Sequence, residues 1–405
     1  MTIRPWFLVS LLALACDVPS SAFDGRVRPV TRDERPDSFD ASVGCQSSPP
    51  RFLTDLPGAA QARVAFVGEA VAVAFVTDAG SVAVRVVDPT TGAERVRETF
   101  RDPAAANLAL GTSGGVLGVA WDSWPSGESN HVRFATVDTV SGAASAPSRL
   151  SPRLGDSQEP VRGRTPRVSS HDAGFFVVWD DGRYAEPRRG GANLFGWQGL
   201  YGHAVDLAGE PEGSDKQIVQ TADGTRSFAL AWTGTDWLTV WSAGDSPVSV
   251  SGRFSGQGYT PAGEPPPLAV VAERKASGVI HLATGGDGRV LAAVPFASPL
   301  GARRLGTLVV SRTGTGAFTA WPELGVGVSA LAGGPTGYVA LTIDVLWQLD
   351  LDGRRLGSQQ LSLEALRPGF ISDTALSVEG KRARLLFTSE TAAGVSIWSA
   401  VACLP

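Results

Sequence analysis

Three segments of the chain combine aromatic, arginine and acidic side chains, which are the residue types with the clearest potential for chemistry. They are 122–130 (DSWPSGESN), 154–164 (LGDSQEPVRGR) and 181–199 (DGRYAEPRRGGANLFGWQG). Exposed Trp, Tyr and Arg on a rigid scaffold are typical of binding hot spots, and with acids they suit a glycan or an acidic protein. The candidate binding residues are Trp124, Arg162, Arg164, Arg183, Tyr184, Arg188, Arg189, Phe195 and Trp197.

The same part of the chain carries carboxylates that a hydrolase could use. If the protein is an enzyme, the candidate catalytic residues are Glu159, Asp180 and Asp181. Catalysis would need two converging acids with separated pKa values, whereas a flat aromatic patch without such a pair would indicate binding. A third interpretation is that Phe195 and Trp197 only cover the fold while the arginines are solvated. We favour binding without catalysis.

Other short motifs are better explained by turns than by chemistry. Residues 111–115 (GTSGG) match a Gly-x-Ser-x-Gly nucleophile motif, but a strand pattern follows the Ser where that motif needs a helix. Residues 169–176 (SSHDAGFF) partly resemble the Asp box of sialidases, itself a structural turn, and no spacing marks a tyrosine nucleophile. Residues 88–94 (DPTTGAE) look like one quinoprotein repeat without its terminal Trp, and the segment 350–353 (DLDG) is too short for a calcium loop.

Charge and composition exclude several classes of protein. The four His lie in different parts of the chain without ligand spacing, so we expect no metal and no cofactor. Lys and Arg number 35 against 40 Asp and Glu, so no basic excess points to nucleic acid. The hydrophobic fraction of 43% is enough for a large core, and 48 Gly with 27 Pro indicate many turns.

One pattern recurs seven times and supplies the elements that must position these residues. Each copy has a short strand, a Gly-rich turn, a strongly apolar second strand and an alternating third strand. The apolar strands are expected at 70–75, 116–121, 175–179, 237–241, 290–296, 338–343 and 383–387. The third strands often end in Asp before a Gly turn, as at Asp88, Asp138, Asp206 and Asp350.

The length and number of the repeats predict a closed ring. Their units begin near Ala62, Ala106, Thr165, Phe228, His281, Ala330 and Ala375. This spacing suits blades of four strands, which need roughly 40–50 residues each. We therefore predict one all-β domain, a closed β-propeller of seven four-stranded blades, although six or eight also fit because the fifth copy is degenerate.

The last unit lacks a fourth strand, and the segment 50–56 (PRFLTDL) lacks a partner near the beginning of the chain. If that segment completes the last blade, the ring closes without long free edges. In such a ring the loops that join strands two and three of a blade lie on the same face as the loops that join one blade to the next. We therefore expect the three segments 122–130, 154–164 and 181–199 on one face.

The first 44 residues predict export. Residues 1–15 read as a signal peptide with a short apolar core, and Leu12 to Cys16 resembles a bacterial lipobox with Ala13 in place of the usual large aliphatic. We expect lipidation at Cys16 and a disordered tether over 16–44, with cleavage after Ala22 as the alternative. No later run reaches 18 apolar residues, so only the lipid would hold the chain to a membrane.

Two cysteines remain after processing, and they flank the predicted domain 45–405. In an exported protein the pair Cys45 and Cys403 suggests a disulfide that staples the ring. The alternative is two unpaired buried thiols.

The run from Thr165 to about residue 245 resembles the repeats of bacterial secreted β-propeller lipoproteins. The matching positions are Trp179, Asp181, Arg183, Asp206 and Gly209. This resemblance implies a propeller fold and an envelope location, either lipid-anchored or secreted and periplasmic. It implies no activity. We expect a monomer whose partner is an envelope protein or glycan, with a purely structural envelope role as a further alternative.

Overall fold

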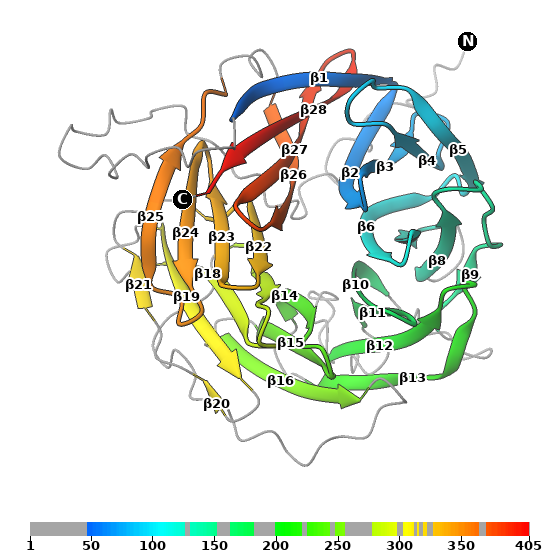
Figure 1. Cartoon of the computed structure of the whole chain (residues 1–405). Coiled ribbons are helices and arrows are strands. Elements are labelled where there is room, and N and C mark those ends of the chain that lie inside the picture. Colours follow the sequence, from blue (N-terminus) through cyan, green and yellow to red (C-terminus); the bar gives the residue numbers. More distant parts are fainter. Residues whose placement is uncertain are drawn as a thin grey trace, which may run out of the picture. The chain divides into compact units, whose positions relative to one another are not determined.

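The computed structural model describes residues 47–125, 130–151, 163–181, 199–220, 225–243, 248–255, 278–297, 303–311, 314–315, 319–321, 327–363 and 370–404. All elements within these ranges are β-strands, and they form seven sheets (Figure 1). A search of the described residues found no helix with the length and apolar character needed to cross a bilayer.

The strands follow the chain from blade to blade. Blade one has β2 (Ala59–Val67), β3 (Ala70–Thr77), β4 (Ser81–Val87) and β5 (Glu94–Arg101). Blade two has β6 (Ala105–Ser113), β7 (Val116–Ser123), β8 (His131–Asp138) and β9 (Ser148–Arg149). Blade three has β10 (Arg164–His171), β11 (Gly174–Asp180), β12 (Gly199–Asp206) and β13 (Pro211–Gln220). Blade four has, within the described ranges, β14 (Thr225–Trp232), β15 (Asp236–Ala243) and β16 (Val248–Ser255).

Blade five has β17 (His281–Thr284), β18 (Val290–Ala297) and β19 (Arg303–Ser311), with β20 (Gly314–Thr315) and β21 (Thr319–Trp321) both paired to β19. Blade six has β22 (Ala330–Gly334), β23 (Gly337–Thr342), β24 (Val345–Asp350) and β25 (Arg355–Gln360). Blade seven has β26 (Phe370–Glu379), β27 (Arg382–Thr391), β28 (Gly394–Cys403) and β1 (Ser48–Pro57).

The blades close into a ring around their first strands. Each innermost strand contacts the next one, in the order β2, β6, β10, β14, β17, β22 and β26, and β26 contacts β2. Figure 1 shows these strands around the centre, with the last strand of each blade at the rim. The predicted all-β propeller is confirmed, and the described strands give it seven sheets.

The first strand of the chain completes the last blade, as predicted. β1 pairs antiparallel with β28, with Ser48 opposite Val401 and Leu56 opposite Val395. Leu53 and Leu56 of β1 are buried in the same cluster as residues of β27 and β28. The two ends of the folded region therefore share one sheet.

The second strands are apolar on both faces because each blade is packed between two others. Every residue of β11 and of β23 is buried. The buried apolar residues fall into seven clusters, each made by two neighbouring blades. The predicted second strands all occur, but the sixth ends at Thr342, because Ile343 lies in the following turn with φ 31° and is 37% exposed.

The predicted Asp-Gly turns follow the third strands. The Asp88 carboxylate accepts the backbone N–H of Thr90 and Thr91 at 2.8 and 2.9 Å. Asp138 does the same for the two residues that follow Thr139. Gly92 has φ 72°, a left-handed conformation that a side chain would strain.

Each innermost strand has one edge without a neighbouring strand, so its backbone groups need other partners. Side chains of adjacent blades supply several of them. Near the beginnings of these strands, side-chain oxygens accept backbone N–H groups: Asp373 Oδ2 from Val64 at 3.0 Å, Gln61 Oε1 from Leu108 at 3.3 Å and Asp122 Oδ2 from Thr165 at 3.2 Å. Near their ends, hydroxyls donate to backbone carbonyls: Ser170 to Thr112 and Thr284 to Trp232, both at 2.5 Å.

Candidate functional site

Irregular pairing marks the beginnings of five innermost strands. The register shifts lie at Ala59/Gln61, Ala106/Ala109, Arg164/Arg167, Thr225/Ser227 and Ile371/Asp373. Two of the shifts carry non-glycine residues with positive φ, Asn107 at 49° and Thr165 at 52°. Bulges re-aim side chains and are frequent beside functional sites. We therefore expect a functional site on the face at which these strands begin.

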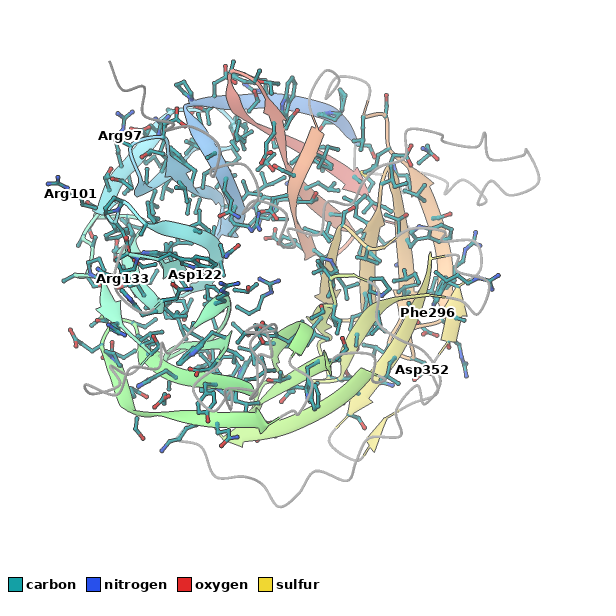
Figure 2. All side chains as sticks on the ribbon, turned by 180° about the vertical axis from the view of Figure 1, so that it is seen from behind. Arg97, Arg101, Asp122, Arg133, Phe296 and Asp352 are labelled. Atoms are coloured by element: carbon teal, nitrogen blue, oxygen red, sulfur yellow. The ribbon has the colours of Figure 1, made fainter. Side chains whose placement is uncertain are left out.

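On this face the buried Asp122 links blades two and three through hydrogen bonds. It follows Trp121 on β7 and is fully buried, and Figure 2 labels it toward the centre of the ring. Its Oδ2 accepts hydrogen bonds from Asn107 Nδ2 at 2.7 Å and from the Thr165 N–H at 3.2 Å. Burial raises the pKa of Asp122, while hydrogen bonds from Asn107, Thr165 and Trp124 and the charge of Arg164 oppose that rise. The carboxyl thus holds its neighbours in place.

Trp124, which is exposed, and Arg164, which is half-buried, form a contact pair beside Asp122. The Arg164 guanidinium lies over the Trp124 ring, with Cζ 3.8 Å from the ring centroid. Trp124 is 41% exposed, and its backbone N–H donates to Ala104 O at 3.0 Å. Arg164 begins β10, opposite Asp180 on β11. Two of the predicted binding residues are therefore in contact, and both backbones are fixed by strands or turns.

A second group of charged residues converges at the centre of the ring. Arg63 Nη1 lies 4.0 Å from Asp373 Oδ1. The Arg167 guanidinium lies 5.6 Å from the centroid of the Phe228 ring. His281 begins β17, two blades further round the ring from Arg167.

The charges of these groups act on one another's pKa values. Burial lowers the pKa of Arg167 to about 10, with the charge of Arg63 acting in the same direction and Asp180 and Asp373 opposing. Burial lowers the pKa of His281 to about 4, and the Arg167 charge adds to the effect. Burial also raises the pKa of Asp373, opposed mainly by Arg63. Blades one, three and five are not neighbours, so their side chains must point to a common centre.

The sequence missed Arg63, Arg167 and Asp373. Each lies a few residues into an innermost strand, close to a register shift that becomes visible only in the structure. His281 was recognised only as an isolated histidine without ligand spacing. No cluster of three or more His, Cys, Asp or Glu suited to a metal occurs in the part of the chain that the structure describes.

The other predicted residues have different positions. Asp180 is 9% exposed and acts electrostatically on Arg167. Asp181 is 1% exposed, and its Oδ2 accepts the Trp179 indole N–H at 2.9 Å, which gives this carboxylate a structural contact. Outside the described residues lie Glu159, Arg162, Arg183, Tyr184, Arg188, Arg189, Phe195 and Trp197, as do Cys16 and Cys45.

The Gly-x-Ser-x-Gly motif is a hairpin between β6 and β7, as expected. Ser113 ends β6, and its hydroxyl donates to the backbone carbonyl of His171 at 2.5 Å. Gly114 and Gly115 have φ 54° and 87°, and β7 follows directly.

Comparison with known proteins supports the fold. No protein-family model matches the sequence. No curated protein matches it either. The polysaccharide lyase Uly1 is similar in structure with a TM-score of 0.54 and 10% identity, covering 85% of this chain and 90% of the lyase. The α-L-arabinofuranosidase Arb93A of Fusarium graminearum has a TM-score of 0.48 and 9% identity, over 88% of this chain and 98% of the enzyme. At 10% identity the likeness to the lyase is one of fold alone, and by fold this chain is a β-propeller.

Proposed function

We propose that this chain is an exported β-propeller, anchored to the cell envelope through a lipid on Cys16, that binds an acidic glycan without cleaving it. The binding face is the one at which the innermost strands begin, around blades two and three. The observation that carries the proposal is the exposed Trp124 ring with the Arg164 guanidinium stacked on it at 3.8 Å.

The Trp124–Arg164 pair is suited to binding because its side chains lose little conformational entropy when a ligand binds. Asp122 is buried beneath it and bonds to Asn107 and Thr165 on both adjoining inner strands. The Trp124 side chain and the guanidinium beside it, already held in position, present an aromatic surface and a positive charge to a ligand. Guanidinium groups match carboxylates in geometry, which favours an acidic sugar over a neutral one.

The two described ends of the insertion in blade three lie on the same face. β11 ends at Asp180 and β12 begins at Gly199, and the Asp181 N–H donates to Gly199 O at 2.9 Å. The insertion therefore leaves and re-enters the sheet on this face. Its sequence contributes Arg183, Tyr184, Arg188, Arg189, Phe195 and Trp197 to the proposed ligand contacts.

Binding is tested with the mature protein and two soluble polysaccharides of opposite character, polygalacturonate and neutral dextran. We expect polygalacturonate to bind and Trp124→Ala and Arg164→Gln each to weaken it about tenfold or more, since hot-spot residues contribute about 1.4 kcal/mol or above. The matched control is Arg355→Gln, because Arg355 lies over Trp347 at 4.6 Å on the rim strand β25.

The proposal fails if Trp124→Ala and Arg355→Gln bind the polysaccharide equally well. If Trp124 is instead needed to retain an envelope protein and no polysaccharide binds, the ligand is a protein. A variant with residues 183–197 replaced by a short Gly-Ser loop tests the contribution of the insertion in the same assay.

Hydrolysis at the centre of the ring is the second candidate function. It is favoured by the convergence of Asp373, Asp180 and His281, and by burial, which raises the pKa of Asp373 as a general acid requires. The measurement is release of reducing ends from the bound polysaccharide. Activity that is lost in Asp373→Asn while binding persists would replace the binding proposal with an enzyme.

The anchor has its own test. In a bacterial host that processes lipoproteins, the chain should incorporate a labelled fatty acid, and Cys16→Ser should abolish the label. Label-free protein that begins at Phe23 in both forms would instead indicate ordinary signal cleavage.

A further inference from the structure

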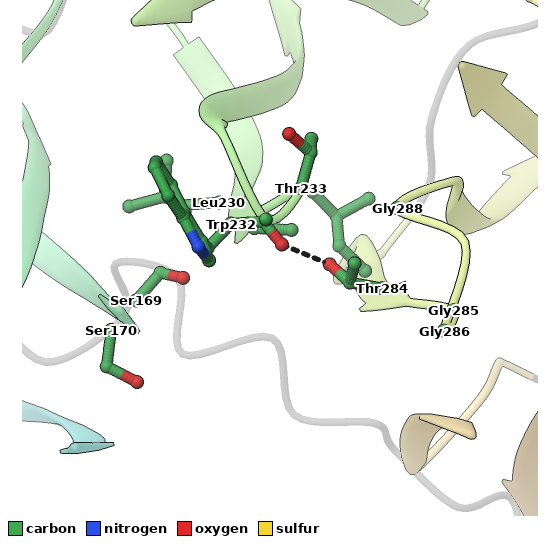
Figure 3. A pocket seen from close by; sticks show the side chains of 12 residues that line it. Ser169, Ser170, Leu230, Trp232, Thr233, Thr284, Gly285, Gly286 and Gly288 are labelled. Atoms are coloured by element: carbon green, nitrogen blue, oxygen red, sulfur yellow. Dashed lines mark hydrogen bonds between the residues drawn. The ribbon is translucent and has the colours of Figure 1, made fainter. Parts of the chain in front are cut away.

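A hollow of about 440 Å³ lies at the opposite ends of the innermost strands (Figure 3). Its walls come from three consecutive blades, with Ser169 and Ser170 on β10, Trp232 and Thr233 at the end of β14, and Thr284 at the end of β17. β10 begins at Arg164, so about 16 Å of strand separates Ser169 from the Trp124–Arg164 pair, at about 3.3 Å per residue. This hollow is thus separate from the binding face already described.

The indole of Trp232 forms one wall and is held by other aromatic rings. Its centroid lies 4.7 Å from that of Trp237 and 5.1 Å from that of His171. Trp237 is itself buried and stacks on Phe176 at 5.6 Å. Figure 3 shows the Trp232 ring beside the Ser169 hydroxyl. Trp232 is half-buried and lines the hollow, so it is the aromatic side chain that a ligand there would contact.

Hydroxyl groups complete the lining. Those of Ser170 and Thr284 donate to backbone carbonyls of neighbouring blades, at 2.5 Å each, and their oxygens keep lone pairs as acceptors. The Ser169 hydroxyl has no partner among the described residues, so it can both donate and accept. The remaining wall is largely glycine, at Gly234, Gly285, Gly286 and Gly288, which keeps the hollow open.

None of the described lining residues carries a charge. A charged ligand would lose its hydration there without gaining an opposite charge. A flat aromatic wall with surrounding hydroxyls instead fits an uncharged ring that carries its own hydroxyls. The volume falls within the range of small-molecule sites, about 300–1,000 Å³. We propose that this hollow is a second binding site, which takes a neutral pyranose sugar stacked on Trp232.

The test titrates the mature protein with the methyl glycosides of glucose, galactose and mannose, followed by saturation-transfer NMR. Methyl glucuronide is the charged counterpart. We expect a neutral glycoside to bind at least tenfold more tightly than the glucuronide. Trp232→Ala should weaken binding of the neutral glycoside about tenfold or more, equivalent to about 1.4 kcal/mol, and Trp232→Phe should retain most of it. Ser169→Leu should also weaken binding, by filling the hollow.

Trp124→Ala is the control for the opposite face and should leave binding of the neutral glycoside unchanged. If Trp232→Ala does not fold, Ser169→Leu decides the question, because it removes no packing contact of the aromatic cluster. The inference is overturned if no neutral glycoside binds up to its solubility limit, or if binding survives Ser169→Leu and is lost with Trp124→Ala. It does not depend on the acidic-glycan proposal, since polygalacturonate binding is measured separately.

Discussion

At the scale of single residues, the buried tryptophans have one recurring requirement, a partner for the indole N–H. Trp121 donates to Asp102 and Trp179 donates to Asp181, at 2.8 and 2.9 Å. In other blades a threonine hydroxyl accepts instead, as from Trp347 to Thr342 at 2.9 Å. The Trp-x-Asp pattern of the third repeat therefore has a structural cause, and Asp181 in particular serves its own blade.

Asp102 gives the sharpest test of this requirement. Its carboxylate accepts from Trp121 and from the Ser123 hydroxyl, and Arg133 Nε lies 3.4 Å away. Asp102→Ala should lower the free energy of unfolding by about 3 kcal/mol, because it leaves the buried donors of Trp121 and Ser123 without a partner. Urea unfolding measures the loss. The control is Asp352→Ala, which removes an exposed ion pair with Arg289 and should cost about 1 kcal/mol or less. Equal losses would contradict the argument.

His281 predicts how stability depends on pH. Its pKa is lowered to about 4 in the folded chain, against about 6.5 when unfolded. The unfolded chain therefore takes up the proton first, so the stability is fully present above about pH 6.5 and is lost as the pH falls toward 4. In His281→Asn, urea unfolding should depend less on pH in this window. Asp373 has a raised pKa, so it acts in the opposite direction and Asp373→Asn should steepen the loss. An unchanged slope in His281→Asn would contradict the assignment.

At the scale of elements, the N-terminal strand is the piece on which the ring depends. β1 supplies the fourth strand of blade seven, and Leu56 is fully buried against blades seven and one. Leu56→Ala should cost about 2–5 kcal/mol, as large-to-small changes in cores do. Deleting residues 46–57 should expose the edge of β28 and cause aggregation, seen by light scattering. A chain that begins at Cys45 keeps β1 and should behave as the full domain. A stable, monodisperse variant without β1 would contradict the closure.

Strands with both faces buried could be predicted from the sequence. The side chains from different blades that converge in space could not. The second strands read as continuous apolar runs because every residue packs on a neighbouring blade. A common face for Trp124 and Arg164 was expected from the sequence, whereas the contact between them was not. Arg63, Arg167 and Asp373 gave no local pattern, because they converge only when blades far apart in sequence close into a ring. The hollow at Trp232 was missed because it is built from the ends of strands on three blades, and its glycines read as ordinary turns.

At the scale of the whole molecule, closure joins two ends that lie far apart in the sequence. The Cys403 N–H donates to Ser47 Oγ at 3.2 Å, and Ser48 lies opposite Val401. Cys45 precedes Ser47 by two residues, so covalent geometry keeps it within about 7 Å of Ser47. This distance is compatible with the predicted Cys45–Cys403 disulfide, which would lock the last blade.

The predicted disulfide should stabilise the protein by lowering the conformational entropy of the unfolded chain. Closing a loop of about 360 residues gives an upper limit of about 6 kcal/mol from chain entropy. We expect the unreduced, denatured mature protein to show no free thiol. Cys45→Ser, Cys403→Ser and the double variant should all lower the melting temperature by the same amount, since each removes the same bond. A reductant should lower that of the wild type to the same level and leave the variants unchanged. Two titratable thiols in the wild type would remove the staple and leave closure to the pairing of β1 with β28 alone.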